Sequence, residues 1–214
     1  NAGATGLALS GVEFGLALMS DATTLTRKWT TLQATAATAG FVGMGTDLVV
    51  SAEDVSVSLN QASLVGDEVV NYTGANKTEL SVATGTGTSL ALDLDGTKGE
   101  LLQASGNLNV NVFGFVALTG NMALSKSSQS VKLGDLASTP LVNEAADVSV
   151  NVLTIGGTGL SAFAGIGGGY TAGVLNSGAT GLSLTGVQFG LALMSDTTNL
   201  TRKWTTLQAT ARSE

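Results

Sequence analysis

The sequence contains neither cysteine nor histidine among its 214 residues. Without cysteine there are no disulfides, no thiolate chemistry and none of the zinc sites that cysteine builds. Without histidine the many serines lack the usual base that activates a nucleophile. Paired carboxylates are present, but aromatic residues make up only 5% of the chain, too few to wall a glycosidase-like cleft. We therefore expect a protein that is not an enzyme and that binds no cofactor.

Charge is also scarce, because charged residues make up only 12% of the chain. Nine basic residues stand against 16 acidic ones, which gives a net charge of −7 and a pI near 4.4. So few scattered cations cannot form the surface that a phosphate backbone requires, so we expect no nucleic-acid partner. No apolar run reaches the roughly 18 residues of a membrane span, so we expect no membrane insertion. The chain opens without Met or a signal peptide, so we expect a fragment whose secretion signal lies elsewhere.

The residues that are abundant favour strands and turns. Val, Thr, Ser, Ala and Leu dominate the chain together with 29 glycines, and proline occurs once. An exposed helix normally carries Glu and Lys on its wet face, and these residues are rare here. The composition therefore predicts an all-β fold with essentially no α-helix.

One stretch of the sequence occurs twice. Residues 1–36 return as residues 176–211 at an offset of 175, and six of the 36 aligned positions differ, which leaves 30 identical. The chain is therefore one full period, residues 1–175, followed by the start of the next, residues 176–214. A fixed period of this kind is typical of arrays in which each unit packs against its neighbours. Cutting such an array leaves unpaired strand edges, which the second copy can close or which can pair between molecules.

Alternating apolar residues predict the strands inside the repeat. Leu7 and Leu9 alternate before a slip at 10–11, and Val12 to Leu18 alternate after it, so we expect a strand, a bulge and a strand. The same sequence of features follows at 48–59, with the slip at 52–54. Residues 33–43 lose the clean polar face and carry small and apolar residues on both phases of the alternation, which predicts that both faces of that segment are covered.

A three-fold pattern lies within the period. It consists of a strand with Phe beside Gly, then an apolar, Ser/Thr, Gly/Ala step, centred on Phe41, Phe115 and Phe163. The Phe spacings of 74 and 48, with 53 to the next copy, predict three related strand, bulge and strand units joined by variable hairpins. The fold we expect is an extended β-solenoid or stacked β-sheet repeat with long hairpins, and the alternative is a single β-sandwich.

The most polar part of the chain lies between residues 63 and 100. Residues 63–80 predict a long excursion, and the alternating residues 90–94 end at Asp95-Gly96, a strong hairpin signal. Asp93, Asp95 and Glu100 partly resemble a calcium loop, but an early ligand is missing and Glu100 comes too soon for a twelve-residue loop. We expect solvated turn acids here, with calcium as the alternative.

A tryptophan flanked by cations appears in both copies of the repeat. Strict alternation places Trp29 on the face opposite to Leu32, beside Thr31 and Gln33. An exposed Trp next to these cations can stack on a sugar or on a neighbouring filament, and the alternative is a Trp folded over the hairpin turn or moved inward by a bulge. The candidate surface-contact residues are Arg27, Lys28, Trp29, Arg202, Lys203 and Trp204.

Four segments together carry a resemblance to a known class of proteins. Residues 29–43, 102–128, 152–165 and 181–194 resemble the long tandem repeats of giant bacterial cell-surface and secreted β-strand-repeat proteins, which are adhesin-like. The resemblance implies an extracellular location at the bacterial cell surface and no catalytic residues. We expect a structural repeat module that acts as a stalk, spacer or self-assembling fibre subunit, with copies of itself as partners. The alternative is an adhesive module that recognises glycan or another surface through its exposed Trp and hairpin loops.

Overall fold

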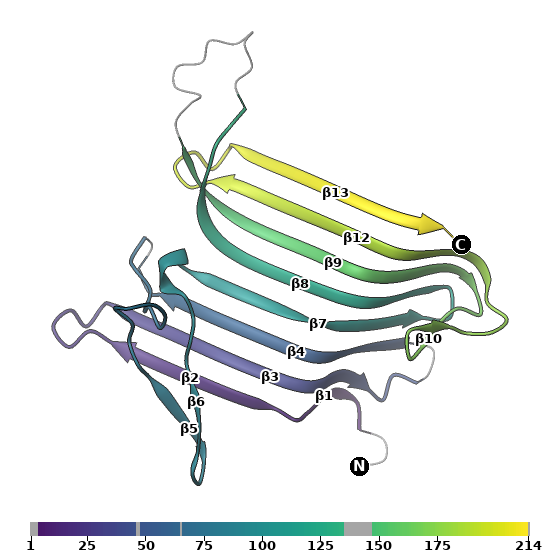
Figure 1. Cartoon of the computed structure of the whole chain (residues 1–214), viewed down its shortest axis with the longest axis horizontal. Helices are drawn as coiled ribbons and strands as arrows, with labels where there is room; N and C mark the ends of the chain where they lie inside the picture. The colour runs from purple at the N-terminus through teal and green to yellow at the C-terminus, as the bar shows by residue number, and fades with distance from the viewer. Residues whose placement is uncertain (1–3, 46–47, 65, 135–146, 214) are drawn as a thin grey trace.

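The computed structural model of the chain describes residues 4–45, 48–64, 66–134 and 147–213. Its main feature is one nine-stranded antiparallel sheet in which the strands follow one another in chain order (Figure 1). β1 and β2 lie end to end along β3 and share one position at the edge. The strands of this sheet are β1 (Gly6–Ser10), β2 (Glu13–Ser20), β3 (Lys28–Val42), β4 (Leu48–Ala62), β7 (Leu101–Val112), β8 (Val116–Val131), β9 (Val148–Ile166), β12 (Thr180–Asp196) and β13 (Lys203–Ser213).

The all-β prediction is confirmed, since the described residues contain strands and a single 3₁₀ turn, Gly96–Lys98, but no α-helix. Two small hairpins accompany the sheet: β5 (Ser81–Gly85) with β6 (Thr88–Ala91), and β10 (Tyr170–Thr171) with β11 (Val174–Leu175). The described residues form neither a solenoid nor the second large sheet of a sandwich. The predicted cover over residues 33–43 is wrong for this chain, because Ala37, Thr38, Phe41 and Val42 are exposed on the open sheet.

Irregular positions line up across the sheet. Gly11, between β1 and β2, has a φ of 56°, and Asp54 in β4 has a φ of 51°. Gly120, Gly159 and Gly186 continue the line in β8, β9 and β12, each with a positive φ and beside a shift in register. The predicted slips at 10–11 and 52–54 are therefore confirmed. A bulge increases local twist and bends its strand, so a line of bulges bends the whole sheet.

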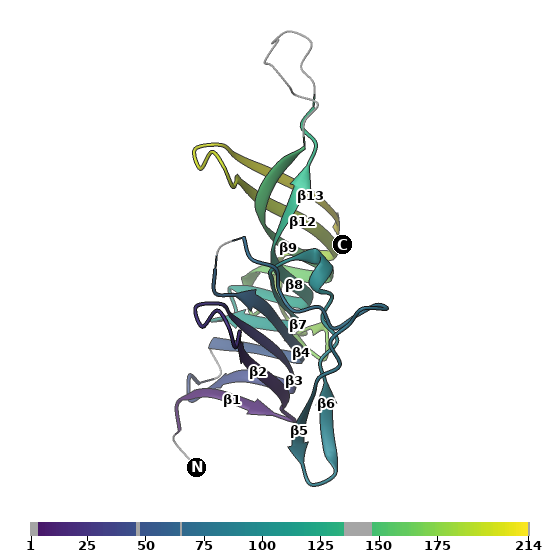
Figure 2. The ribbon, with the colours of Figure 1, turned by 90° about the vertical axis from the view of Figure 1, so that its left-hand side faces the viewer.

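The segment between β4 and β7 folds back over one end of the sheet, and we call residues 66–98 the clasp. Its strands β5 and β6 stand on one side of β2, β3 and β4 (Figure 2). Ala17 of β2 forms a buried cluster there with Tyr72, Leu92 and Leu94 of the clasp. The predicted excursion is thus confirmed and is longer than expected.

The predicted hairpin at Asp95-Gly96 is wrong. The Asp95 carboxylate accepts hydrogen bonds from the backbone N–H and the hydroxyl of Thr97, at 3.1 and 2.6 Å, and caps the 3₁₀ turn instead. Asp side chains commonly bond to backbone two residues on, which competes with a hairpin. The clasp's own hairpin turns instead between β5 and β6, within the Thr-Gly-Thr-Gly-Thr stretch.

The three Phe residues that define the predicted units have different surroundings. Phe163 is buried in a second cluster with Ala117 and Tyr170 at the opposite end of the sheet from the clasp, whereas Phe41 and Phe115 are exposed. The division of residues 1–175 into three related units stays a prediction. Residues 1–3 of the first repeat copy lie outside the described residues, as does residue 214, which follows the second copy.

Candidate functional site

The two copies of the repeated stretch form the two edges of the sheet. The first copy is β1, β2 and β3 with their connecting turns, and the second is β12 and β13, in which β12 corresponds to β1 and β2 together (Figure 1). Both are antiparallel hairpins with the same register: Met19 lies opposite Trp29 in the first, and Met194 lies opposite Trp204 in the second. The chain therefore contains one local structure in two different surroundings.

An aspartate at the start of the turn fixes the hairpin in each copy. In the first copy, Asp21 Oδ1 accepts hydrogen bonds from the backbone N–H groups of Thr23 and Thr24 at 2.8 and 3.0 Å. The Thr23 hydroxyl, donating at 2.7 Å, and these N–H groups lower the pKa of Asp21 from 3.8 to about 2. Asp196 is bonded in the same way, and its pKa is lowered chiefly by the Asn199 N–H.

Alternate residues from Arg27, which directly precedes β3, along the first part of β3 point to the clasp. Arg27 makes a two-pronged contact with the Asp67 carboxylate, with Nε–Oδ2 and Nη2–Oδ1 distances of 2.8 and 2.7 Å. These hydrogen bonds lower the pKa of Asp67. Trp29 Nε1 donates to the Glu68 carbonyl at 2.9 Å, and the Arg27 guanidinium lies 5.2 Å from the centre of the Trp29 ring. We call the four alternate residues the β3 row: Arg27, Trp29, Thr31 and Gln33.

The other two members of the β3 row bind deeper parts of the clasp. Thr31 is fully buried, and its hydroxyl lies 2.9 Å from the Tyr72 hydroxyl and 3.1 Å from Asn60 Oδ1. Gln33 accepts a hydrogen bond from the Asp93 N–H at 2.8 Å and donates to the Asp93 carboxylate. The expectation that Trp29 shares a face with Thr31 and Gln33 is confirmed, because all three meet the clasp.

The same four residues recur in β13 as the β13 row: Arg202, Trp204, Thr206 and Gln208. No clasp segment lies over them in the described part of the chain. Arg202 keeps its bond to Asp196 at 3.2 Å and lies 5.1 Å from the centre of the Trp204 ring. Thr206 and Gln208 are exposed, whereas Thr31 and Gln33 are buried and half-buried. The second copy is therefore preformed but uncovered.

Two equivalent glycines, one in each copy, show the same difference in how far the hairpin is covered. A Cβ atom placed on Gly15 would lie 3.0 Å from Leu90 and 3.4 Å from Val82 of the clasp, while one on the equivalent Gly190 would meet nothing within 4 Å. Gly190 instead forms part of an open groove of about 620 Å³. The groove crosses β13, β12, β9, β8 and β7 and is lined by Gln103, Ser125, Thr154, Gln188, Gly190, Ala192, Thr206, Gln208 and Thr210, among others.

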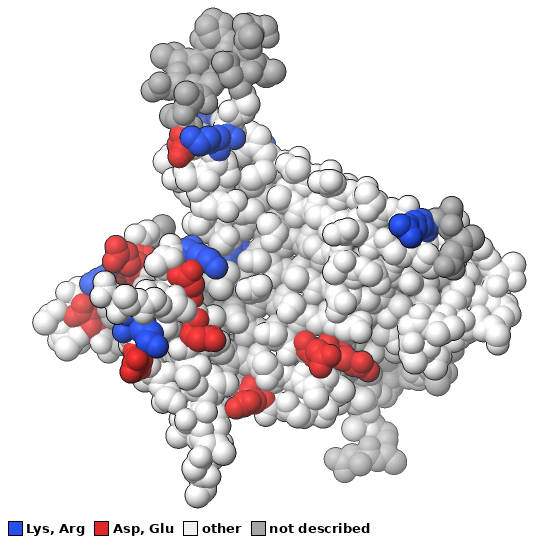
Figure 3. All heavy atoms as spheres, viewed as in Figure 1, with Lys and Arg blue, Asp and Glu red and all other residues white. Residues whose placement is uncertain are grey.

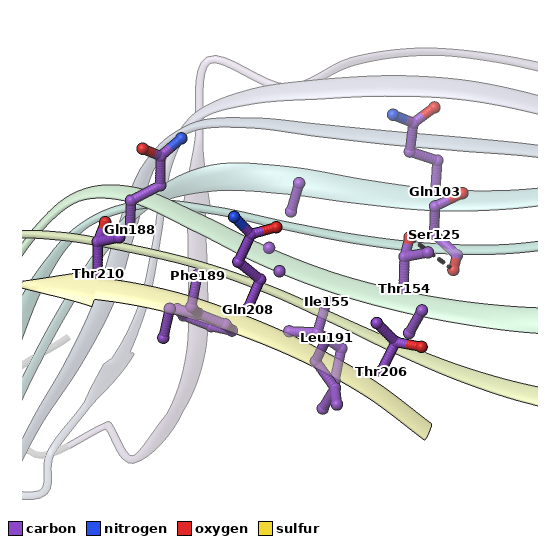
Figure 4. A pocket seen from close by; sticks show the side chains of 15 residues that line it. Gln103, Ser125, Thr154, Ile155, Gln188, Phe189, Leu191, Thr206, Gln208 and Thr210 are labelled. Carbon is purple, nitrogen blue, oxygen red and sulfur yellow. Dashed lines mark hydrogen bonds between the residues drawn. The ribbon is translucent and has the colours of Figure 1, made fainter. Parts of the chain in front are cut away.

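The groove lies on the side of the sheet that the clasp covers in the first copy. Gln103, Gln188 and Gln208 project to this side, while Ile155 and Leu191 point to the other (Figure 4). Charged side chains gather around the clasp and the neighbouring strand ends, and the surface over β8, β9 and β12 is almost without them (Figure 3). The groove is thus a neutral floor of amides, hydroxyls and small residues.

Each sheet edge exposes apolar residues whose counterparts in the other copy are covered by a neighbouring strand. Leu18 of β2 is 72% exposed, whereas its counterpart Leu193, beside β9, is 39% exposed. Conversely, Leu207 of β13 is 65% exposed, whereas its counterpart Leu32 is half-buried beside β4. Each copy therefore lacks the one neighbouring strand that the other copy has.

The structure separates the three acids of the calcium alternative. Asp95 caps the 3₁₀ turn, Asp93 binds Gln33, and Glu100 Oε1 accepts the Ala62 N–H at 3.3 Å. Among the described residues no group of three or more acids is arranged to hold a metal ion. The acids are used as local hydrogen-bond acceptors.

The predicted surface-contact residues behave differently in the two copies. Arg27 and Trp29 are engaged by the clasp, while Lys28 is exposed at the start of β3. In the second copy Arg202 and Lys203 are exposed, and Trp204 is half-buried. Sequence reasoning missed the partners Asp67, Tyr72 and Asp93 as members of the site. The available signal was that all four residues of the row are identical in both copies.

Comparisons of the chain with protein-family models, curated proteins and solved structures found no significant match. Within the described part of the chain, none of the helical structure has the length and hydropathy of a transmembrane span.

Proposed function

We propose that this chain is a structural repeat module of a giant extracellular protein and acts as a stalk, spacer or self-assembling fibre subunit. The observation that carries the proposal is the placement of one hairpin, in two copies, at the two edges of one sheet. Each copy is unpaired on the side where the other is paired. The extracellular, bacterial cell-surface location follows from the resemblance of the repeats, and the proposal assigns no catalytic group.

The pairing in the chain defines how such an array would continue. β9 pairs with β12, so a β9-like strand fits the free edge of β2, which has nearly the same sequence. β4 pairs with β3, so a β4-like strand fits the free edge of β13. Unpaired edges expose rows of N–H and C=O groups that recruit further strands. In another copy of this chain β4 and β9 are already paired on both sides, so neighbouring repeats would supply these strands. Two separate copies would instead join end to end, with β13 of one beside β2 of the other.

One period contributes six strand positions to the sheet: β1 with β2, β3, β4, β7, β8 and β9. Neighbouring strands lie about 4.8 Å apart, so each period would lengthen the array by roughly 29 Å. The line of bulges would recur in every period and bend the ribbon in the same direction each time. A long array would then wind into a solenoid-like ribbon, held by ladder hydrogen bonds along its whole length.

A second candidate function is adhesion to glycan. The groove of amides and hydroxyls beside Trp204 favours it, because sugars are bound by such groups and by aromatic rings. The Arg202 guanidinium lies over the Trp204 ring, so a sugar would have to stack on the opposite face of that ring. Glycan-array binding that is lost in Trp204→Ala would support this candidate.

Edge pairing is tested by placing a charge on each edge. Leu18→Lys with Leu207→Lys puts Lys on exposed side chains of β2 and β13, a substitution that natural edge strands use to prevent pairing. Sedimentation and electron micrographs should show concentration-dependent chains for the native protein and monomers for the double variant. Leu200→Lys is the matched control, because Leu200 is equally exposed but lies in a turn. A native protein that stays monomeric at every concentration contradicts the proposal.

A further inference from the structure

We infer that the groove beside the β13 row is a receptor for a second clasp, which a neighbouring repeat of the proposed array would contribute. The inference rests on the proposed function and adds to it, because edge pairing alone requires no contact on the face of the sheet. In this interface, the segment of the neighbouring repeat that corresponds to residues 66–98 would cover β12 and β13, as residues 66–98 cover β2 and β3.

The first copy of the hairpin shows every contact that the second would make. Arg202 would receive the Asp67 carboxylate, and Trp204 Nε1 would donate to the Glu68 carbonyl, as Arg27 and Trp29 do. Thr206 would meet the Tyr72 hydroxyl, as Thr31 does. These receptor residues are identical in the two copies and lie on the same face at the same register.

The floor of the groove also has the shape that receives the clasp in the first copy. Its floor at Gly190 and Ala192 corresponds to Gly15 and Ala17, both buried under the clasp in the first copy. Leu90 packs over Gly15 there, and the space above Gly190 is open. A glycine at this position leaves room for a leucine side chain from above.

The hairpin of the clasp extends beyond the sheet that it covers. β5 and β6 reach past the free edge of β2 in both views (Figures 1 and 2). If a β9-like strand paired with β2, the projecting part of the β5–β6 hairpin would lie over that strand and over the β8-like strand next to it. From β12 the groove likewise extends across Thr154 of β9 and Ser125 of β8. Their hydroxyls can hydrogen-bond to the Gly- and Thr-rich tip of the clasp hairpin.

Charge favours the same occupant. The clasp carries five acidic residues (67, 68, 79, 93 and 95) and two basic ones (77 and 98), a net charge of −3. The end of the second hairpin presents Arg202 and Lys203, both exposed. Because the clasp of this chain is already held on β2 and β3, the occupant of the second site would be a further clasp.

The test adds a synthetic peptide of residues 48–98, which contains β4 and the clasp, to the full chain. The peptide carries a dye, and fluorescence anisotropy is measured at chain concentrations where sedimentation shows monomers. We expect saturable binding of one peptide per chain. Gly190→Val should weaken this binding about tenfold or more, because its methyl groups occupy the place of Leu90. The fold is preserved, since nothing lies within 4 Å of that position.

Two controls connect the binding to the proposed contacts. Gly134→Val, also in open space but away from the groove, should bind the peptide like the native chain. Arg202→Met in the chain and Asp67→Asn in the peptide should each weaken binding about fivefold, and the pair together should weaken it no further.

The outcomes separate this inference from the proposed function. No saturable binding, or equal binding by Gly190→Val, overturns the clasp receptor even if the chain assembles through its edges. Groove-dependent binding of a glycan in place of the peptide also overturns it. Peptide binding by a chain that never assembles upholds the receptor and contradicts the structural function instead.

Discussion

The first and second hairpins have nearly the same sequence and the same turn, yet one lies inside a folded unit and the other does not. Thr31 is fully buried, whereas its counterpart Thr206 is exposed. The hairpin itself comes from local signals: period-two alternation, the Asp turn and the pairing of Met with Trp. Burial comes from distant residues: Asn60 and Tyr72, the hydrogen-bond partners of Thr31, lie 29 and 41 positions away. The difference separates what a repeat specifies by itself from what its neighbours supply.

Substitutions in the core between the clasp and the first hairpin should lower stability more than any substitution in the uncovered second hairpin. Leu92 is 4% exposed within the cluster that joins the clasp to Ala17, so Leu92→Ala should cost about 2–4 kcal/mol in the free energy of unfolding. Urea denaturation measures this cost. Leu200→Ala, in the exposed turn of the second copy, should change stability by less than about 0.5 kcal/mol. Equal costs at the two positions would show that the clasp is not packed on the first hairpin.

Replacing the equivalent threonines should give an intermediate effect. Thr31→Val removes the hydroxyl that meets Tyr72 and Asn60 in a buried position, and should cost about 1–3 kcal/mol. Thr206→Val changes an exposed strand residue and should lie within about 0.5 kcal/mol of the native chain. The two variants are compared by thermal and urea unfolding. A loss at Thr206 as large as that at Thr31 contradicts the account.

The equivalent glycines should respond differently to the same substitution. Gly190→Ala should stabilise the chain by about 0.5–1 kcal/mol, because Gly is unfavourable within a strand and the space is open. Gly15→Ala should give no such stabilisation, because its Cβ would lie only 3.0 Å from the Leu90 side chain. Matched denaturation curves measure the difference between the two. Equal stabilisation at both sites would place the clasp hairpin away from β2.

The smallest effect concerns a feature that the copies share. Asp21 has a pKa of about 2 in the folded chain against 3.8 ordinarily, and Asp196 is shifted in the same direction. Because the folded pKa is the lower one, this contribution to stability is complete above about pH 4 and is lost as the pH falls towards 2. NMR titration of the side-chain carboxyl carbons should show both groups titrating below 3.8. A normal pKa at either turn would contradict the shared capping.

Much of the local structure could be predicted from the sequence. Alternation located the strands around residues 7–18, and glycine within that alternation located the bulge at Gly11. The same rule placed Trp29 on the face of Thr31 and Gln33. These features depend on neighbours in the chain, so a single sequence contains them.

Contacts between distant segments could not be predicted in the same way. The partners of the β3 row lie about 40 to 60 residues further on, in a polar stretch without strong periodicity. Asp95-Gly96 was misread because its side chain makes an Asx-type cap in place of a hairpin. The single open sheet was not foreseen, since the bend depends on bulges that align only after five strands have paired.

Residue-resolved hydrogen exchange in dilute solution tests the central claim most directly, namely that one hairpin sequence occupies a covered and an uncovered position. The account predicts slow exchange of the amides in residues 28–35 and fast exchange of the outward-facing amides in residues 203–210, with the difference shrinking as the protein is concentrated. Equal protection of the two strands in the dilute monomer would contradict it.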